Sequence, residues 1–538
     1  AVSLKKRYMK KALFISLLLL IGVQLSGQDK CWIFFTDKGD TQQYIPSDLL
    51  SDRALARRAN QGILIDSYDY PVQSTYLQTL RGNGVAIQQT SRWLNAASAN
   101  LTIEQVAWVS SLPFVKKVQP IRSYNVVLGE EMDCPDSPFL DEPERQLEMV
   151  GLLDFHAQGF TGENVLVAVF DNGYLEVDEL EGMSHLFKDA RILATRDYVD
   201  GDNTLYHSCT HCKHGTYVFS ILAANDTASG LVGSAPGAEY ILFRTENDDS
   251  ETRQEEDNWL AAAEFADSMG AQVFNTSLGY YFFDEGEEDY QFSDLDGETS
   301  IITRAGDIAA SRGIIVVNSA GNSGQRGLNM PADGDSVLAI GAVDQCEEVT
   351  SFSSVGPTAD GRIKPDLSAM GRSNFFLRNT GALARGSGTS FSSPIVAGLS
   401  ACLLQAAPYA SSTQIYQAMR RTASFADEPN NSIGYGIPNA GSALEFLEGT
   451  AKINRLLVYP NPVSESQFRI AVPSALIHQT QNLEIIDLMG RNITPTTLTT
   501  TGGQIDVQLP ASVKPGHYIV RMWGEGKAVY FQKLTVTR

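Results

Sequence analysis

The pattern of apolar and polar residues divides the chain into three parts. Between about 30 and 126, alternating segments predict strands at 31–39 (CWIFFTDKG) and 114–121 (FVKKVQPI), and 50–63 (LSDRALARRANQGI) predicts an amphipathic helix. From about 147, short apolar runs alternate with helical patterns. After about 450, short strand-like segments follow one another between turn residues, which predicts a small all-β sandwich.

The middle part is predicted to be an α/β domain with a parallel sheet. Its apolar runs predict buried strands at 164–170 (NVLVAVF), 240–244, 272–277, 314–320 and 336–343. Helical patterns between and after them lie at 214–225, 258–270, 300–313 and 389–407. Buried strands that alternate with helices indicate a sheet covered on both faces. Ligands of such folds bind at the carboxyl ends of the strands.

The N-terminal 27 residues are predicted to be a secretory signal. A basic run, KKRYMKK, precedes the apolar segment Ala12 to Val23 and a stretch with small residues. The apolar segment is too short for a comfortable membrane span, although a membrane anchor is the alternative. Met9 is the expected initiator. We expect a soluble, exported mature protein.

The acidic composition argues against nucleic acid and anionic membranes as partners. Sixty-three acidic residues against 41 Lys and Arg give a net charge of −22, so there is no cationic surplus for nucleic acid or an anionic membrane.

The acidic, proline-containing stretch 128–145 predicts a linker. The expected units are therefore 1–27, 28–135 including the linker, 140–448 and 452–538.

Residues 208–216 (SCTHCKHGT) hold two of the six cysteines, which are Cys31, Cys134, Cys209, Cys212, Cys346 and Cys402. In an exported protein this favours a disulfide, either between Cys209 and Cys212 or from one of them to another cysteine. Free thiols and a metal site are the alternatives, and the sequence does not fix the pairing. Cys402 is predicted to be a small buried residue of a helix.

Four polar residues stand at the ends of predicted elements. Asp171 ends the strand at 164–170, Asn322 follows the strand at 314–320, and His214 and Ser390 open helices. The four side chains should therefore meet at one edge of the sheet. Acyl transfer needs such a set, because serine requires a base, the base requires an orienting carboxylate, and the oxyanion requires donors. Pro394 is expected to be tolerated as part of the first helical turn.

The blocks VFDNG, HGT, AGN and GTSFSSP resemble the signature blocks of the subtilisin family of serine proteases, in that family's order. The resemblance covers about 150–445. It implies a serine endopeptidase that forms an acyl-enzyme, with Asp171 orienting His214, His214 as base, Ser390 as nucleophile and Asn322 as oxyanion donor. The segment 273–279 (VFNTSLG) resembles the family's substrate-binding strand, which implies that Ser277, Leu278 and Gly279 bind substrate. Asn172 stands where the family mostly has Ser or Thr, and we expect it not to touch the carboxylate.

The flanking parts carry weaker resemblances. The N-terminal part resembles subtilisin-like prodomains, which implies a zymogen inhibited by its own prodomain; an ordinary accessory domain is the alternative. The C-terminal part, with YPNP (459–462), IIDLMGR (485–491) and KPGHYIVRM (514–522), resembles the sorting domain of type IX secretion. That implies a partner in the type IX machinery and delivery through the periplasm of a Gram-negative bacterium to the surface or the medium. A carbohydrate-binding or other substrate-binding sandwich is the alternative.

The resemblance implies protein or peptide substrates, no metal in the chemistry and no required cofactor. It leaves room for a structural calcium, for which Asp200, Asp202 and Asn203 are candidate ligands, although their spacing matches no recognised calcium loop. The alternative function is a catalytically silent subtilisin-like protein that serves in binding or adhesion.

Overall fold

The computed structural model describes most of the chain. The described residues are 29–120, 142–202, 204–207, 209, 211–284, 289–408, 410–454, 457–464, 466–472, 480–487, 491–493, 496–499, 504–523 and 529–537. The predicted signal at 1–27 and most of the predicted linker lie outside these residues.

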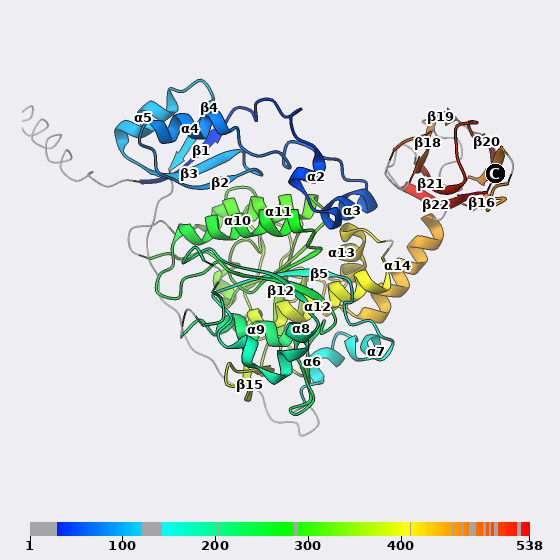
Figure 1. The fold of residues 1–538 in the computed structure, drawn as a ribbon. Helices are drawn as coiled ribbons and strands as arrows, with labels where there is room; N and C mark the ends of the chain where they lie inside the picture. Colours follow the sequence, from blue (N-terminus) through cyan, green and yellow to red (C-terminus); the bar gives the residue numbers. More distant parts are fainter. Residues whose placement is uncertain are drawn as a thin grey trace, which may run out of the picture.

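A parallel sheet forms the centre of the molecule (Figure 1). Its strand order is β13-β12-β11-β10-β5-β9-β6. The strands are β5 (Leu166–Asp171), β6 (Ile192–Asp197), β9 (Glu239–Arg244), β10 (Val273–Thr276), β11 (Ile315–Ser319), β12 (Val337–Val343) and β13 (Leu367–Met370). The chain order reverses between β5 and β10, and such a switch point is where α/β sheets place their ligands.

Helices cover both faces of the sheet, and the strand residues alternate accordingly. In β5, Val167 and Val169 enter the core on one face, whereas Ala168 and Phe170 enter the core on the other. Helices on the first face are α7 (Leu152–Ala157), α9 (His214–Ala223), α12 (Thr389–Ala406), α13 (Ser412–Arg421) and α14 (Ala440–Asn454). The second face carries α10 (Arg253–Met269) and α11 (Ile301–Ser311). The predicted α/β class is confirmed.

The shorter elements of this part connect or flank the sheet. They are the helices α6 (Arg145–Glu148) and α8 (Ser184–Lys188), the small pair β7 (Asn225–Asp226) and β8 (Leu231–Val232), and the hairpin of β14 (Asn374–Leu377) with β15 (Leu383–Gly386).

The N-terminal domain is an antiparallel sheet in the order β2-β3-β1-β4, and two of its helices cover one face of that sheet. Its elements are β1 (Asp29–Phe35), α2 (Pro46–Leu49), α3 (Asp52–Gln61), α4 (Ser74–Gly82), β2 (Ile87–Ser91), β3 (Ala96–Leu101), α5 (Ile103–Ser110) and β4 (Val115–Pro120). Ile33 and Phe35 pack with Leu80 of α4 and Val109 of α5. Trp32 and Phe34 face the other way and join the core that lies under α10 and α11, so the domain sits on these two helices (Figure 1).

The C-terminal domain consists of antiparallel strands, as predicted. One sheet has the order β16-β17-β20 and the other β19-β18-β21-β22. The strands are β16 (Leu457–Tyr459), β17 (Gln467–Ala471), β18 (Thr480–Asp487), β19 (Thr496–Thr499), β20 (Gln504–Gln508), β21 (Gly516–Trp523) and β22 (Val529–Val536). They share a core of their own, and Figure 1 shows them to the side of the α/β domain beyond α14.

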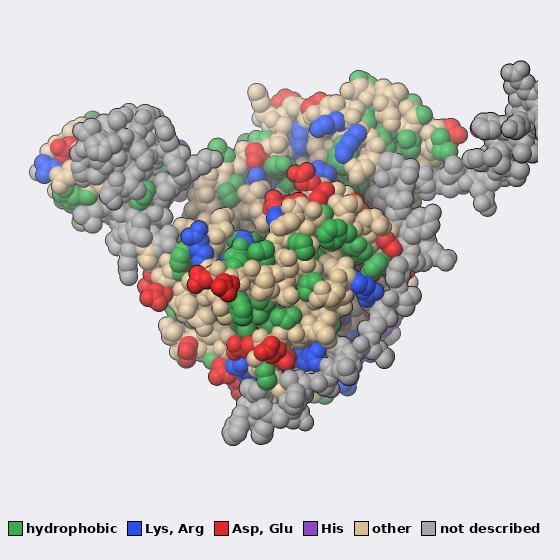
Figure 2. Space-filling view, turned by 180° about the vertical axis from the view of Figure 1, so that it is seen from behind, with side chains coloured by type: hydrophobic (Ala, Val, Ile, Leu, Met, Phe, Trp, Pro, Cys, Tyr) green, Lys and Arg blue, Asp and Glu red, His purple; other side chains and the backbone are tan. Residues whose placement is uncertain are grey.

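Among the described residues, the structure has no helix long and apolar enough to cross a membrane. On the face shown in Figure 2, acidic and basic side chains are interspersed, so the described residues present no extended basic surface there for nucleic acid.

Candidate active site

Asp171 and His214 are joined by a short hydrogen bond at the carboxyl end of β5. Nδ1 of His214 lies 2.7 Å from Oδ1 of Asp171, whose side chain is fully buried. Burial of the imidazole opposes its protonation, but the adjacent Asp171 carboxylate outweighs this, with a smaller contribution from Asp248. Together they raise the pKa of His214 above its ordinary value. The geometry gives His214 a fixed orientation, with Nδ1 turned toward the carboxylate.

Asn172 contacts Asp171 and Gly215, the residue that follows His214. Its backbone N–H donates to Oδ1 of Asp171 at 2.9 Å, and its side-chain oxygen accepts the N–H of Gly215 at 3.2 Å. The expectation that Asn172 does not touch the carboxylate is therefore wrong. The contact comes from the backbone amide that follows the strand end and not from the side chain, so it does not depend on the type of residue at this position.

Ser390 lies in the first turn of α12 and exchanges hydrogen bonds with Ser277. Its hydroxyl donates to the carbonyl oxygen of Ser277 at 3.1 Å, while the Ser277 hydroxyl donates to the carbonyl oxygen of Ser390 at 2.9 Å. In the described structure the Ser390 hydroxyl makes no hydrogen bond to His214. Hydroxyl–imidazole bonds of this type are often long or unmade in enzymes without substrate.

The hydrogen bond from the Ser277 hydroxyl to the Ser390 carbonyl oxygen explains why α12 tolerates Pro394, and the predicted reason is wrong. Pro394 lies in the second turn of α12, not in its first, and it has no N–H for the carbonyl of Ser390 four residues earlier. The Ser277 hydroxyl takes the place of that missing donor. A proline is tolerated there because a neighbouring strand end satisfies the freed carbonyl.

Asn322 follows β11 and lies beside the residue that precedes Ser390. Its side-chain oxygen accepts the backbone N–H of Thr389 at 2.8 Å and the Thr389 hydroxyl at 3.0 Å. Two donors to one atom identify that atom as the oxygen, so the NH₂ group of Asn322 is left as a donor. Asn322 is exposed, and this donor is available near the start of α12.

A ring contact brings the two halves of the site together. The imidazole of His214 stacks against the ring of Phe391, with centroids 6.2 Å apart and planes inclined by 29°. Because Phe391 follows Ser390, the contact places His214 alongside the start of α12. Asp171, His214, Ser390 and Asn322 therefore lie at the same edge of the sheet, as their positions at element ends predict.

The segment after β10 runs along this edge. The carbonyl oxygen of Leu278 accepts hydrogen bonds from Nδ2 of Asn318 at 3.2 Å and from the Ser319 hydroxyl at 3.3 Å. Gly279 lies so close to Asn329 that an added Cβ would stand 2.6 Å from the Asn329 Cβ. Ser277, Leu278 and Gly279 are thus held by β11 and the loop after it, next to Ser390.

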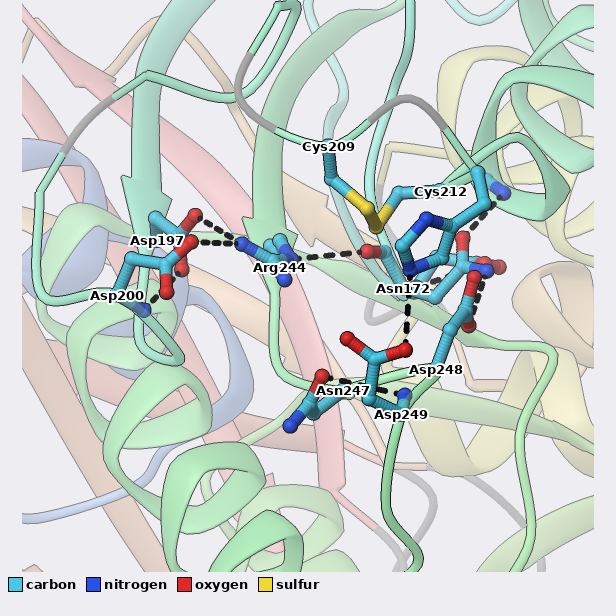
Figure 3. Close-up of a disulfide and its surroundings, with 12 residues drawn as sticks. Asn172, Asp197, Asp200, Cys209, Cys212, Arg244, Asn247, Asp248 and Asp249 are labelled. Atoms are coloured by element: carbon cyan, nitrogen blue, oxygen red, sulfur yellow. Dashed lines mark hydrogen bonds and ion pairs between the residues drawn. A yellow bond between two sulfur atoms is a disulfide. The ribbon is translucent and has the colours of Figure 1, made fainter.

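Cys209 and Cys212 form a disulfide, with Cα atoms 5.3 Å apart. Among the alternatives that the sequence leaves open, this is the pairing found. Cys212 is buried against Gly173, where an added Cβ would stand 2.7 Å from the Cys212 Cβ. The disulfide thereby packs against the segment that follows Asp171, and Figure 3 shows it beside Asn172. Cys212 precedes His214 by two residues. Cys402 is buried, as predicted.

Two of the three candidate calcium ligands, Asp200 and Asp202, already have partners within the protein. Asp200 pairs with Arg244, and Oδ1 of Asp202 accepts the N–H of Thr204 at 2.7 Å. Asn203 lies outside the described residues. The calcium expectation stays a prediction.

Three family models match the chain. The subtilase family matches residues 162–436, the peptidase S8 propeptide domain of Bacteroidota matches 30–133, and the secretion system C-terminal sorting domain matches 457–537. The chain belongs to the subtilase family. The subtilase match covers half of the chain and holds all of the residues described above.

Individual subtilases are similar at moderate identity. Subtilisin DY of Bacillus licheniformis is 31% identical over 271 residues, which are 50% of this chain and 86% of the relative. Subtilisin NAT of Bacillus subtilis subsp. natto is 29% identical over 358 residues, 66% of this chain and 81% of the relative. Among solved structures, the MycP3 protease of the type VII (ESX-3) secretion system is similar, at 22% identity and a TM-score of 0.47, over 58% of this chain and 90% of that one. The protein is a serine-type peptidase with a propeptide domain and a sorting domain.

Sequence reasoning missed three residues of this subtilase site. Thr389 binds the Asn322 side chain, Phe391 stacks on His214, and Asp248 accepts a hydrogen bond from Asn172. Thr389 and Phe391 flank Ser390, so their proximity was readable from the sequence, whereas their contacts were not. Asp248 lies in the loop after β9, and its only signal was an acidic loop beginning just past a strand of the same sheet.

Proposed function

We propose that the protein is a secreted serine endopeptidase that cleaves peptide bonds through Ser390, His214 and Asp171. The observation that carries the proposal is the 2.7 Å bond between His214 and Asp171 at the sheet edge where α12 presents Ser390. With Nδ1 committed to Asp171, Nε2 is the nitrogen that accepts the proton of Ser390. The hydroxyl turns from Ser277 toward Nε2 when substrate binds, and its oxygen attacks the scissile carbonyl.

Asn322 and the first amides of α12 stabilise the oxyanion that forms. The NH₂ group of Asn322 is oriented by the two bonds that its oxygen receives from Thr389. A donor that is already oriented stabilises developing charge without reorganisation in the transition state. His214 then gives its proton to the leaving amine, and the acyl-enzyme is hydrolysed by the reverse sequence. Ser277, Leu278 and Gly279 pair with the substrate backbone beside Ser390.

The N-terminal domain acts as prodomain and inhibitor. This proposal is supported by buried ion pairs that join the N-terminal domain to α10. The carboxylate of Asp267 in α10 forms ion pairs with Arg58 at 3.0 Å, with Arg92 at 2.8 Å and with Arg57. Burial opposes the Asp267 charge, but the three guanidinium groups hold the pKa of Asp267 below its usual range. Apolar contacts of Trp32 and Phe34 complete the docking.

The two ends of the chain serve its delivery out of the cell. We propose a signal at 1–27, a prodomain and linker at 28–135, a catalytic domain at 140–448 and a sorting domain at 452–538 that the type IX secretion machinery recognises. The protein then reaches the medium or the cell surface through the periplasm. The chemistry uses side chains of the chain itself and requires no cofactor, and a structural calcium with Asp200, Asp202 and Asn203 as its candidate ligands remains a prediction.

The experiment compares hydrolysis of denatured casein by the wild type and by Ser390→Ala, with Ser411→Ala as the matched serine control. Ser411 is the N-cap of α13 and lies outside the site. We expect full loss of hydrolysis only in Ser390→Ala. Equal hydrolysis by wild type and Ser390→Ala would refute the proposal. If processing is autocatalytic, Ser390→Ala also keeps the residues before about 140, and normal maturation of the inactive variant would assign processing to another protease.

A further inference from the structure

Four aromatic rings form a continuous series that starts at His214 and returns to the same helix. The imidazole of His214 stacks on Phe391, with centroids 6.2 Å apart and planes inclined by 29°. Phe391 stacks on Phe376 of β14 at 5.3 Å and 21°, and Phe376 stacks on Tyr217 at 4.6 Å and 28°. Tyr217 follows His214 by three residues in α9, so both ends of the series stand on neighbouring positions of that helix. We call these four residues the aromatic cluster.

The hairpin that carries Phe376 is fixed on both of its strands. In β14, the backbone N–H of Leu377 donates to the Ser220 hydroxyl of α9 at 2.9 Å. In β15, Gly386 lies against two ring edges, because an added Cβ would stand 2.7 Å from the Phe391 ring and 2.9 Å from the Phe376 ring. Both rings are buried. The hairpin backbone therefore leaves Phe376 and Phe391 little room to move.

The imidazole of His214 is held less completely than these two rings. Its side chain is 33% exposed. The hydrogen bond from Nδ1 to Asp171 fixes the direction of that nitrogen, but the torsion that turns an imidazole is soft, so one bond leaves the tilt of the ring plane free. The Ser390 hydroxyl donates to Ser277 in this structure. The stacking on Phe391 is thus the contact that sets the tilt of the His214 ring before substrate binds.

We propose that Phe376 and Tyr217 are positioning residues that keep the His214 imidazole in the plane required for proton transfer from Ser390. Phe376 supports the Phe391 ring, and Tyr217 supports the Phe376 ring. Both therefore act on His214 through Phe391. The inference rests on the proposed function, because it assigns a role toward the same base.

The physical basis is the strong dependence of proton transfer on geometry. A hydrogen bond weakens steeply as its angle departs from linearity, and a small displacement of a catalytic group lowers the rate by a large factor. Loss of the Phe376 ring frees space beside Phe391, so the Phe391 ring and the imidazole that stacks on it can tilt. The bond to Asp171 and the segment that binds substrate are not altered. The loss should therefore appear in kcat and not in KM.

The test is steady-state hydrolysis of a chromogenic peptide by the matured variants, with rates expressed per active site titrated with a fluorophosphonate. Phe376→Leu should lower kcat about twofold to tenfold, the factor that corresponds to one aromatic pair, with KM within about twofold of the wild type. Tyr217→Leu should lower kcat by a smaller factor. Tyr217→Phe, which keeps the ring, should match the wild type. The double variant should be no slower than Phe376→Leu, because Tyr217 acts through Phe376.

The matched control is Phe187→Leu. Phe187 pairs with Tyr206, with centroids 5.8 Å apart, and both rings pack against the same core as the aromatic cluster. The substitution removes a ring from a different pair, so it should lower the melting temperature and leave kcat per titrated site unchanged. If Phe376→Leu does not mature, the comparison of Tyr217→Leu with Tyr217→Phe decides the question.

Failure of this inference and failure of the proposed function give different results. If hydrolysis depends on Ser390 but Phe376→Leu keeps the wild-type kcat per titrated site, the positioning role is overturned and the proposed function stands. A loss confined to KM, or an equal loss in Tyr217→Leu and Tyr217→Phe, would also overturn the positioning role. If hydrolysis survives in Ser390→Ala, the proposed function itself fails.

Discussion

Ser277 and Ser390 each donate a hydrogen bond to the carbonyl oxygen of the other, at 2.9 and 3.1 Å. The exchange joins the end of β10 to the first turn of α12. It also satisfies the Ser390 carbonyl, which Pro394 leaves without a helical donor. The substrate-binding segment and the candidate nucleophile are thus parts of one hydrogen-bonded unit, which has consequences for stability.

Ser277→Ala should destabilise the fold more than it slows the reaction. It removes the hydroxyl that donates to the Ser390 carbonyl, and a buried acceptor without a partner costs about 1–3 kcal/mol. The backbone carbonyl of Ser277 remains. Urea unfolding in a Ser390→Ala background, which prevents self-digestion, measures the cost. Unchanged unfolding would show that the bond does not hold α12 in place.

Asn322→Ala should lower kcat by about 10²–10³, the loss seen when the comparable donor is removed from subtilisin. KM should stay near the wild-type value, because the amide acts on charge that develops only in the transition state. Steady-state kinetics on a peptide substrate separates the two constants. A change confined to KM would remove Asn322 from the oxyanion role.

Asp267→Asn should loosen the N-terminal domain. Three arginines would lose a buried counter-charge, and breaking such a cluster costs about 3–5 kcal/mol. In the Ser390→Ala zymogen, added trypsin should remove the N-terminal domain faster from Asp267→Asn. The control is Asp335→Asn, since the Asp335 carboxylate is exposed and pairs with Arg362 of the catalytic domain. Equal rates in all three proteins would contradict docking through Asp267.

Loss of the disulfide should weaken stability more than chemistry. A loop this short contributes about 2 kcal/mol in the chain-entropy model. The double variant Cys209→Ser and Cys212→Ser, like dithiothreitol, should lower the melting temperature and leave most of kcat, with Cys346→Ser as control for an exposed free cysteine. Phenanthroline should have no effect on activity. Stoichiometric zinc that is lost together with activity would contradict this account.

Truncation after residue 456, which spares α14, should leave a folded and active protease inside the periplasm. The C-terminal strands have a core of their own, so their removal exposes little of the catalytic domain. Activity in periplasmic and medium fractions measures the outcome. Export of the truncated protein to the medium would refute the sorting role.

The central strands and the site edge were predictable because their signals are local. The buried runs at 164–170 and 314–320 are continuous, and Asp171 and Asn322 follow them directly. The edge strands β6 and β13 were not predicted. β6 (ILATRD) is partly polar and exposed, so it lacks the continuous apolar pattern of a central strand. β13 (LSAM) is buried but has only four residues, one of them a serine, which is too short for a clear pattern.

Contacts between distant segments could not be read from the chain. The bond from Ser277 to Ser390 spans 113 positions, and the one from Asn172 to Asp248 spans 76. The sequence predicts which strand ends meet, but the choice of hydrogen-bond partners depends on side-chain packing after folding. For this reason the sequence did not reveal that Ser277 compensates for Pro394, or that Asn172 contacts Asp171 and Asp248.

The most direct test of the account is the site of a fluorophosphonate adduct. The matured protein is incubated with the probe, digested, and mapped by mass spectrometry, with Ser390→Ala as the parallel sample. We predict one adduct per chain, on Ser390, formed more slowly as the pH falls through the raised pKa of His214, because only the neutral imidazole accepts the proton. An active wild type without an adduct on Ser390, or equal labelling of Ser390→Ala, would contradict the assignment of Ser390 as the nucleophile.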